Sequence, residues 1–213
     1  MAIMITKDKL REWSACTDGY GWFLENFPAG EAEYQAVLDK LAEANRPSDA
    51  RWLIENAGPD DSVVEVESLA GTHFFFAGSV VVKGAIEIRG CVFAGSGIEA
   101  GESIEAGWSI KAGESIKAER SIKAGESIKA GESIKAERSI KAERSIKAGE
   151  SIKAGESIKA GWSIKAGESI EAGENFAIFA GLNLGILTWP IYAKIIAKTK
   201  PKNLFGGHWE ENP

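Results

Sequence analysis

The chain contains 213 residues, of which 44% are apolar and 26% are charged, and its formal net charge is −6. These values are ordinary for a soluble globular protein and allow one or two domains. The acidity is concentrated in residues 1–79, where 14 acidic residues oppose 6 basic ones, a net charge of −8. The two cysteines, Cys16 and Cys91, lack metal-ligand spacing, so we expect buried, reduced thiols in a cytosolic protein without a metal or cofactor. The first residues lack the apolar run of a signal peptide.

Residues 1–60 show helical periodicity and are predicted to form an acidic head domain. Apolar residues at helical spacing predict four helices, around residues 10–17, 20–27, 31–45 and 49–56, with Ser48 as the N-cap of the last. Trp13, Trp22 and Trp52 are interpreted as core residues. A segment of this size buries a small core, so we expect the head to lean on the first solenoid coil and cover its open end. The alternative is that its acidic outer face docks a basic partner.

The segment Trp13–Phe27, with the arrangement Ala15-Cys16-x-x-Gly19-x-x-Trp22, resembles a small helical module of uncharacterised phage and prophage proteins. Some of these proteins carry A-G-x-x-I-x-A-G repeats downstream. The resemblance implies a phage setting, in the cytoplasm of a bacterial host, rather than a particular activity.

After a linker or first strand over residues 61–73, the chain becomes periodic. Thirteen hexapeptides of the form I-[KE]-A-[GE]-[EWR]-[SN] follow one another over residues 98–175. Stepping by sixes in both directions extends the pattern to residues 74–187, about nineteen hexads. In this register Phe176 and Leu182 continue the Ile column. A fixed short period of this kind is typical of a solenoid.

Each hexad reads as one short strand and one corner. Ile and Ala lie two residues apart and point inward together, and the chain must then turn because the next alternate residue is Glu, Trp or Arg. The turn falls on Gly in ten of the thirteen hexads, where a positive φ is easily adopted. Glu119, Glu137 and Glu143 occupy the other three, at a cost of roughly 1 kcal/mol each if they adopt the same left-handed conformation.

The variations within the repeat recur at multiples of three hexads. Arg138 follows Arg120 by three hexads, and Trp162 follows Trp108 by nine. We therefore predict a mainly β fold with a helical head: a three-sided β-helix of about 18 residues per coil, about six coils long and capped at both ends. The repeat resembles the left-handed β-helix of hexapeptide-repeat proteins, which favours a left-handed coil, although the sizes of the two inward residues are swapped relative to that family.

Residues 188–213 are predicted to form a C-terminal cap helix and tail. Pro190 suits the first turn of a helix, with Ile191, Tyr192, Ile195 and Ile196 on its apolar face. The alternative is that this tail binds a partner subunit and makes a homo-oligomer. The apolar stretch 176–193 is interrupted by Asn183, Thr188 and Pro190, so we interpret it as a buried solenoid end and not as a membrane span.

The repeat offers binding residues but no catalytic set. Two tryptophans among charges make a contact patch, because Trp and Arg are enriched at binding hot spots. Its candidate residues are Trp108, Trp162, Arg120, Arg138, Arg144 and Glu126. In the same three-hexad register, one column contains Lys111, Lys129, Lys147 and Lys165 and another contains Glu114, Glu132, Glu150 and Glu168. We interpret these columns as a solvated, ion-paired surface that blocks edge-to-edge aggregation.

The acyltransferases that resemble this repeat usually carry a catalytic His in their coils, whereas the two histidines here, His73 and His208, lie outside the perfect hexads. We therefore expect a non-enzymatic protein-binding protein, an inhibitor or adaptor of a host or defence protein, and we expect neither nucleic acid nor a membrane as its partner. The alternatives are a self-assembling structural rod and an acyltransferase-like protein.

Overall fold

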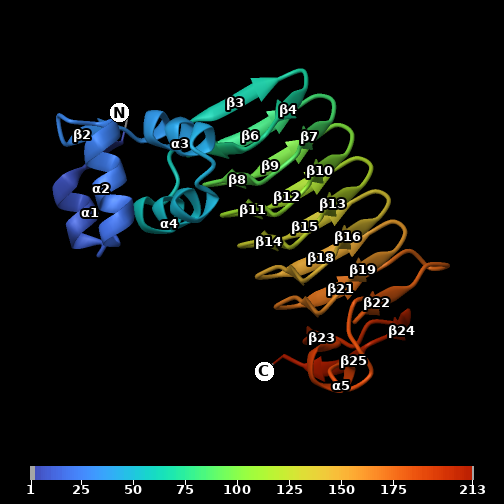
Figure 1. The fold of residues 1–213 in the computed structure, drawn as a ribbon. Coiled ribbons are helices and arrows are strands. Elements are labelled where there is room, and N and C mark those ends of the chain that lie inside the picture. Colours follow the sequence, from blue (N-terminus) through green and yellow to red (C-terminus); the bar gives the residue numbers. More distant parts are fainter. Residues whose placement is uncertain (1–2, 213) are drawn as a thin grey trace.

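The computed structural model describes residues 3–212 and shows a helical head beside a long parallel β-solenoid (Figure 1). The predicted fold class is confirmed, including the length of the coil, because the paired strands within residues 74–171 are offset by eighteen positions, as Ile104 and Ile122 are.

The head contains four helices and a two-stranded antiparallel sheet that the sequence pattern does not predict. The helices and strands are β1 (Met4–Thr6), α1 (Lys7–Glu12), α2 (Thr17–Asn26), β2 (Glu31–Glu33), α3 (Tyr34–Glu43) and α4 (Pro47–Ala57). Helix α4 begins one residue before Ser48, because Pro47 fills its first turn, and its N-cap residue Arg46 provides no side-chain cap. Ser48 is therefore not the N-cap.

Three parallel sheets form the sides of the rod. Sheet 1 contains β3 (Val63–Val66), β6 (Ser79–Val82), β9 (Ile98–Ala100), β12 (Ile116–Ala118), β15 (Ile134–Ala136), β18 (Ser151–Ala154) and β21 (Ser169–Glu171). Sheet 2 contains β4 (Leu69–Gly71), β7 (Ile86–Ile88), β10 (Ile104–Ala106), β13 (Ile122–Ala124), β16 (Ile140–Ala142), β19 (Ile158–Ala160), β22 (Ile178–Ala180) and β24 (Leu204–Gly206). Sheet 3 contains β5 (Phe74–Phe76), β8 (Val92–Ala94), β11 (Ile110–Ala112), β14 (Ile128–Ala130), β17 (Ile146–Lys147), β20 (Ile164–Lys165), β23 (Lys194–Ala197) and β25 (His208–Glu211).

The Ile and Ala columns fill the interior of the rod. Every Ile from Ile98 to Ile170 is at most 2% exposed, and the Ala residues beside them are nearly all as deeply buried. Each stacked Ile contributes roughly 1.5–3 kcal/mol by leaving water. Because the pairing register is Ile on Ile and Ala on Ala, the hexad pattern determines the register in which paired strands meet.

The solenoid is longer at both ends than the hexad pattern predicts. Its first coil begins at Val63, because β3 pairs with β6 at an offset of sixteen positions, Val64 opposite Val80, which a search in steps of six misses. At the other end Ile158 pairs with Ile178 across a longer connection, so Ile178 belongs to the Ile column. Phe176 and Leu182, which the pattern assigns to that column, are each 45% exposed.

The C-terminal cap helix is a wrong prediction. Helix α5 (Trp189–Tyr192) has only four residues, and the chain then forms β23, which pairs with β20. Ile195 is fully buried in the rod, so its apolar spacing reflects a strand. The stretch 176–193 is a buried end only in part, because Ile178 and Ala180 are at most 1% exposed whereas Ile186 and Leu187 are 90% and 87% exposed.

The corner glycines do not adopt a positive φ. Among the described residues this conformation occurs at Gly30, Gly58, Gly181 and Gly207, and at the non-glycine residues Ser14 and Asn45. The glycines permit close stacking instead: a Cβ on Gly131 would lie 1.8 Å from the carbonyl oxygen of Gly113, one coil earlier. The left-handed cost that the sequence analysis assigns to the three corner glutamates therefore does not arise.

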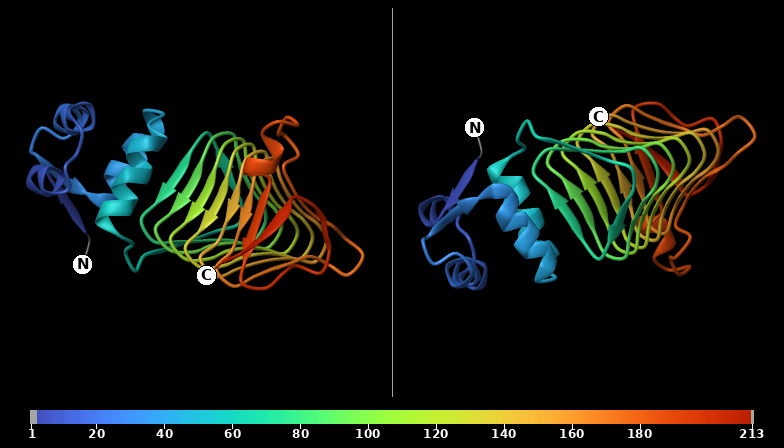
Figure 2. Two further views of the ribbon diagram at one scale, coloured as in Figure 1. Left: turned by 90° about the horizontal axis from the view of Figure 1, so that it is seen from below. Right: turned by 90° about the horizontal axis from the view of Figure 1, so that it is seen from above.

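The head packs against the side of the rod and does not cover its open end (Figure 2). Phe75 and Phe93 stand at the outward position of sheet 3, stack on each other with centroids 5.2 Å apart, and join the head core. Helices α3 and α4 cover them. The head core needs an apolar surface, and sheet 3 provides one only in its first coils.

Candidate protein-binding site

One corner of the rod carries four of the predicted residues in a single column. Trp108, Glu126, Arg144 and Trp162 follow one another along the turns between sheets 2 and 3. Each backbone N–H of the last three donates to the carbonyl one coil earlier, at 2.8 Å. We call this column the tryptophan corner. Its two indoles are 44% and 43% exposed.

The indoles at both ends of this corner are held by neighbours. The Arg144 guanidinium lies 5.7 Å from the ring centroid of Trp162 and forms an ion pair with Glu126 at 3.3 Å. A cation over an indole face is attracted by the ring quadrupole. Trp108 packs edge-to-face against the ring of His73 at 5.3 Å. Both rings are therefore exposed yet oriented.

His73 connects the tryptophan corner to the head. Its Nδ1 accepts the backbone N–H of Cys91 at 3.0 Å, and its Nε2 lies 2.6 Å from Asn45 Oδ1. These partners require the neutral tautomer with the proton on Nε2. Burial lowers the pKa of His73, which favours the same neutral form.

The other two predicted residues lie elsewhere. Arg120 and Arg138 stack on each other at the corner between sheets 1 and 2, and Arg120 pairs with Glu102 at 3.8 Å. The structure therefore separates the six candidates into two corners, four on one and two on the other. Residues share a corner only when they are a multiple of three hexads apart, and positions 108 and 120 differ by two hexads. The sequence therefore already predicts that the two groups lie on different corners.

An exposed apolar loop continues the tryptophan corner beyond Trp162. The Asn183 side chain donates to the backbone oxygen and to a carboxylate oxygen of Glu143, both at 2.8 Å, which ties the loop to this corner. Beyond Asn183 the loop exposes Ile186, Leu187 and Ile191. The apolar composition of this loop predicts a place in the rod interior, so its sequence does not indicate this extension.

The lysine column of sheet 3 meets the head at its first member. Lys111 is only 9% exposed, and its Nζ contacts Glu55 Oε1 of α4 at 2.7 Å. Lys129, Lys147 and Lys165 continue the column beyond the head, as the sequence predicts.

The head contains a cavity of about 330 Å³ that the sequence analysis does not anticipate. Its lining includes Leu10, Cys16, Trp22, Phe23, Val37, Asp49 and Trp52. Trp22 and Trp52 are half-buried and pack against the head core. The prediction that they are core residues therefore holds only for the part of each ring that faces the core. Their spacing alone does not distinguish a filled core from a lined cavity.

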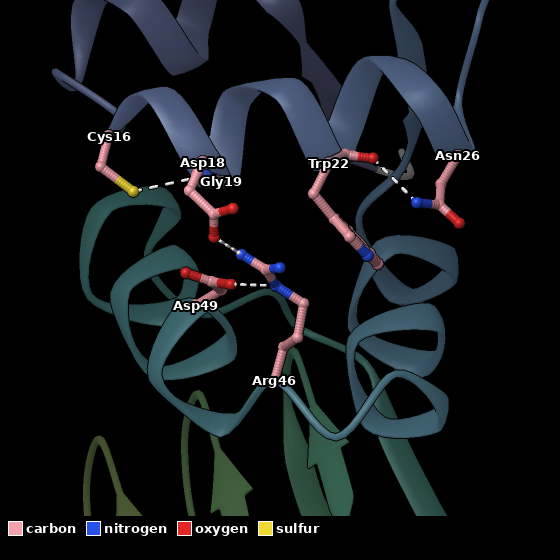
Figure 3. Close-up of polar contacts among 7 residues, drawn as sticks. All are labelled: Cys16, Asp18, Gly19, Trp22, Asn26, Arg46 and Asp49. Atoms are coloured by element: carbon pink, nitrogen blue, oxygen red, sulfur yellow. Dashed lines mark hydrogen bonds and ion pairs between the residues drawn. The ribbon is translucent and has the colours of Figure 1, made fainter.

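Arg46 links helices α2 and α4 of the head (Figure 3). Its guanidinium donates to the carboxylates of Asp18 and Asp49, which raise its pKa, and lies 5.5 Å from the ring centroid of Trp22. Cys16 is exposed and not buried as predicted, because it is the N-cap of α2, where its Sγ accepts the Gly19 N–H at 3.3 Å. Cys91 is buried, and burial raises the pKa of its thiol.

Within residues 3–212, no group of three His, Cys, Asp or Glu side chains is arranged to hold a metal ion. No helix of this range is long and apolar enough to cross a membrane.

Residues 1–57 match the family model of the YdhT N-terminal domain. The match covers the head and stops before β3. No curated protein and no solved structure matches the chain.

Proposed function

We propose that this chain is a non-enzymatic protein-binding protein, phage-encoded, that acts as an inhibitor or adaptor of a host or defence protein through the tryptophan corner. One observation carries the proposal: Trp108 and Trp162 are each more than two-fifths exposed, on one column, with their rings held by His73 and Arg144. Oriented aromatic side chains lose little conformational entropy on binding and are enriched at hot spots.

The spacing of the corner supports a single partner surface. Three coils separate the two indoles, a distance of roughly 14 Å along a parallel stack. The Glu126–Arg144 pair between them offers both charges to hydrogen-bonding groups of a partner. Because the rungs are joined by backbone hydrogen bonds, the column presents these groups with little rearrangement.

His73 favours binding over the acyltransferase alternative, because both of its ring nitrogens have partners in the fold. A general base needs a ring nitrogen directed at a substrate proton.

Affinity capture from bacterial lysate tests the proposal. The wild-type chain, a Trp108→Ala/Trp162→Ala variant and an Arg120→Ala/Arg138→Ala control are used as baits. We expect the first variant to lose the captured partner and the control, altered at the other corner, to retain it. Equal recovery by all three baits would contradict a site at the tryptophan corner and direct attention to the head. Calorimetric titration with acetyl-CoA provides the independent test of the enzyme alternative.

A further inference from the structure

The first coil leaves one end of the rod open. Its inward residues are only partly buried, although they occupy the same columns as fully buried residues of the next coil. These half-covered residues are Val64, Val66, Leu69, Phe74 and Phe76. Val80 and Val82, directly after them in sheet 1, are 0% and 1% exposed. The head lies beside this end and not over it (Figure 2).

The edge of β3 also has unpaired backbone groups. In a parallel sheet, successive residues direct their N–H and C=O groups to opposite neighbours. The inward residues Val80 and Ala148 donate to the following coil, at 2.9 Å each, so the outward residues direct their groups to the preceding coil. Sheet 1 ends at β3, and no described residue lies before it to pair with Glu65.

The charge of this edge indicates the kind of strand it fits. In sheet 1, the other outward glutamates pair with lysines one coil away, Glu99 with Lys117 at 2.5 Å and Glu171 with Lys153 at 3.3 Å. Glu65 faces Val81 instead, and no ion pair involving it occurs among residues 3–212. Glu65 therefore lacks the lysine neighbour that the other outward glutamates of the sheet have, and a lysine on an added strand would provide it.

We propose that the β3 edge binds an extended segment of a partner protein, which adds as a parallel strand with aliphatic side chains on Val64 and Val66 and a lysine beside Glu65. Strand addition of this kind combines main-chain hydrogen bonds with alternating side-chain contacts. A second copy of this chain is the poorer occupant, because its open end would bring its own Asp60, Asp61 and Glu65 against the same carboxylates. This surface is separate from the tryptophan corner, and its test does not depend on that site.

The chain's own repeat provides matched probes. The peptide Ser-Ile-Lys-Ala-Gly has the sequence of residues 145–149, and Ser-Ile-Glu-Ala-Gly has that of residues 103–107. Each is titrated into the ¹⁵N-labelled full chain, and binding is followed by amide shifts and by hydrogen exchange at Glu65. We expect the lysine peptide to bind about two- to fivefold more tightly, the range for a cross-strand charge pair, and to slow exchange of the Glu65 amide.

Charge reversal makes the proposal falsifiable. Glu65→Lys should reverse the preference between the two peptides. Glu171→Lys, at the edge strand of the opposite end, should leave the preference unchanged, because that glutamate already has Lys153. Equal affinity for both peptides, or a preference that Glu171→Lys abolishes, would overturn the proposal. So would light scattering that shows a dimer of the free chain which Glu65→Lys disperses, since a second copy would then occupy the edge.

Discussion

At the scale of single residues, the Lys111–Glu55 contact is asymmetric. Burial lowers the pKa of Lys111, whereas the hydrogen bond from Lys111 lowers the pKa of Glu55. The first shift indicates a costly buried ammonium and the second a favourable pair. We give more weight to the burial, because the Lys111 side chain is 11% exposed against 45% for Glu55.

This asymmetry predicts different costs for the two partners. Glu55→Gln leaves a buried ammonium poorly paired and should lower the free energy of unfolding by about 1–3 kcal/mol. Lys111→Met leaves a carboxylate that water can reach and an apolar chain beside Phe93, and should change it by less than about 1 kcal/mol. Urea denaturation of both variants measures the difference. A larger loss for Lys111→Met would show that the ion pair itself dominates.

His73 should make the joint between head and rod sensitive to acid. Its pKa is lowered from 6.5 in the folded chain, so the unfolded chain binds the proton more readily. The stabilisation is therefore complete above pH 6.5 and decreases as the pH falls toward the folded pKa. His73→Gln keeps an acceptor for Cys91 and a donor for Asn45 but does not titrate. We expect its midpoint of urea denaturation to vary less than that of the wild type between about pH 7 and pH 5.

At the scale of the element, the hexad predicts the coil but not its ends or its partners. The spacing of Ile and Ala determines the strand, the corner and the pairing register, because every hexad has the same inward residues at the same positions. The ends depend on connections of uneven length, such as the loop before Lys194, which carry no period. The place of the head depends on Phe75 and Phe93, one coil apart at an outward position of sheet 3 where the next four coils have Lys. That substitution is the signal in the sequence that a face is covered.

The corner glycine column gives the prediction at this scale. Gly131→Ala places a Cβ against the Gly113 carbonyl oxygen, so the stacked corners must separate, and we expect a loss of about 1–3 kcal/mol in unfolding free energy. Glu137→Ala is the matched control, because its corner already accommodates a Cβ; its change should stay within about 0.5 kcal/mol. Thermal melts and urea midpoints compare the two. Equal losses would mean that close stacking does not select glycine at these corners.

At the scale of the whole molecule, the number of hexads between two residues determines whether they lie on the same face of the rod. Removing residues 127–144 deletes one full coil, and every later strand stays in its own sheet. Removing residues 133–144 deletes two thirds of a coil, so every later strand moves to another face. Both deletions begin at a Ser, end at Arg144 and leave only Ile and Ala inside. We therefore expect both variants to fold, with similar circular dichroism and melting behaviour.

The two deletions should differ in where Trp162 lies relative to Trp108. After the deletion of a full coil the two positions share one corner, two coils or roughly 10 Å apart. After the shorter deletion they lie on different corners. With Trp108→Cys and Trp162→Cys in each background, and Cys16→Ser to remove the exposed thiol, a bismaleimide crosslinker that spans two coils should bridge only the first variant. Bridging in both would mean that faces are not kept in steps of three hexads, and the tryptophan corner would then not be a consequence of the repeat. If only the first is bridged, partner capture by the two deletions separates a need for aligned indoles from a need for either indole alone.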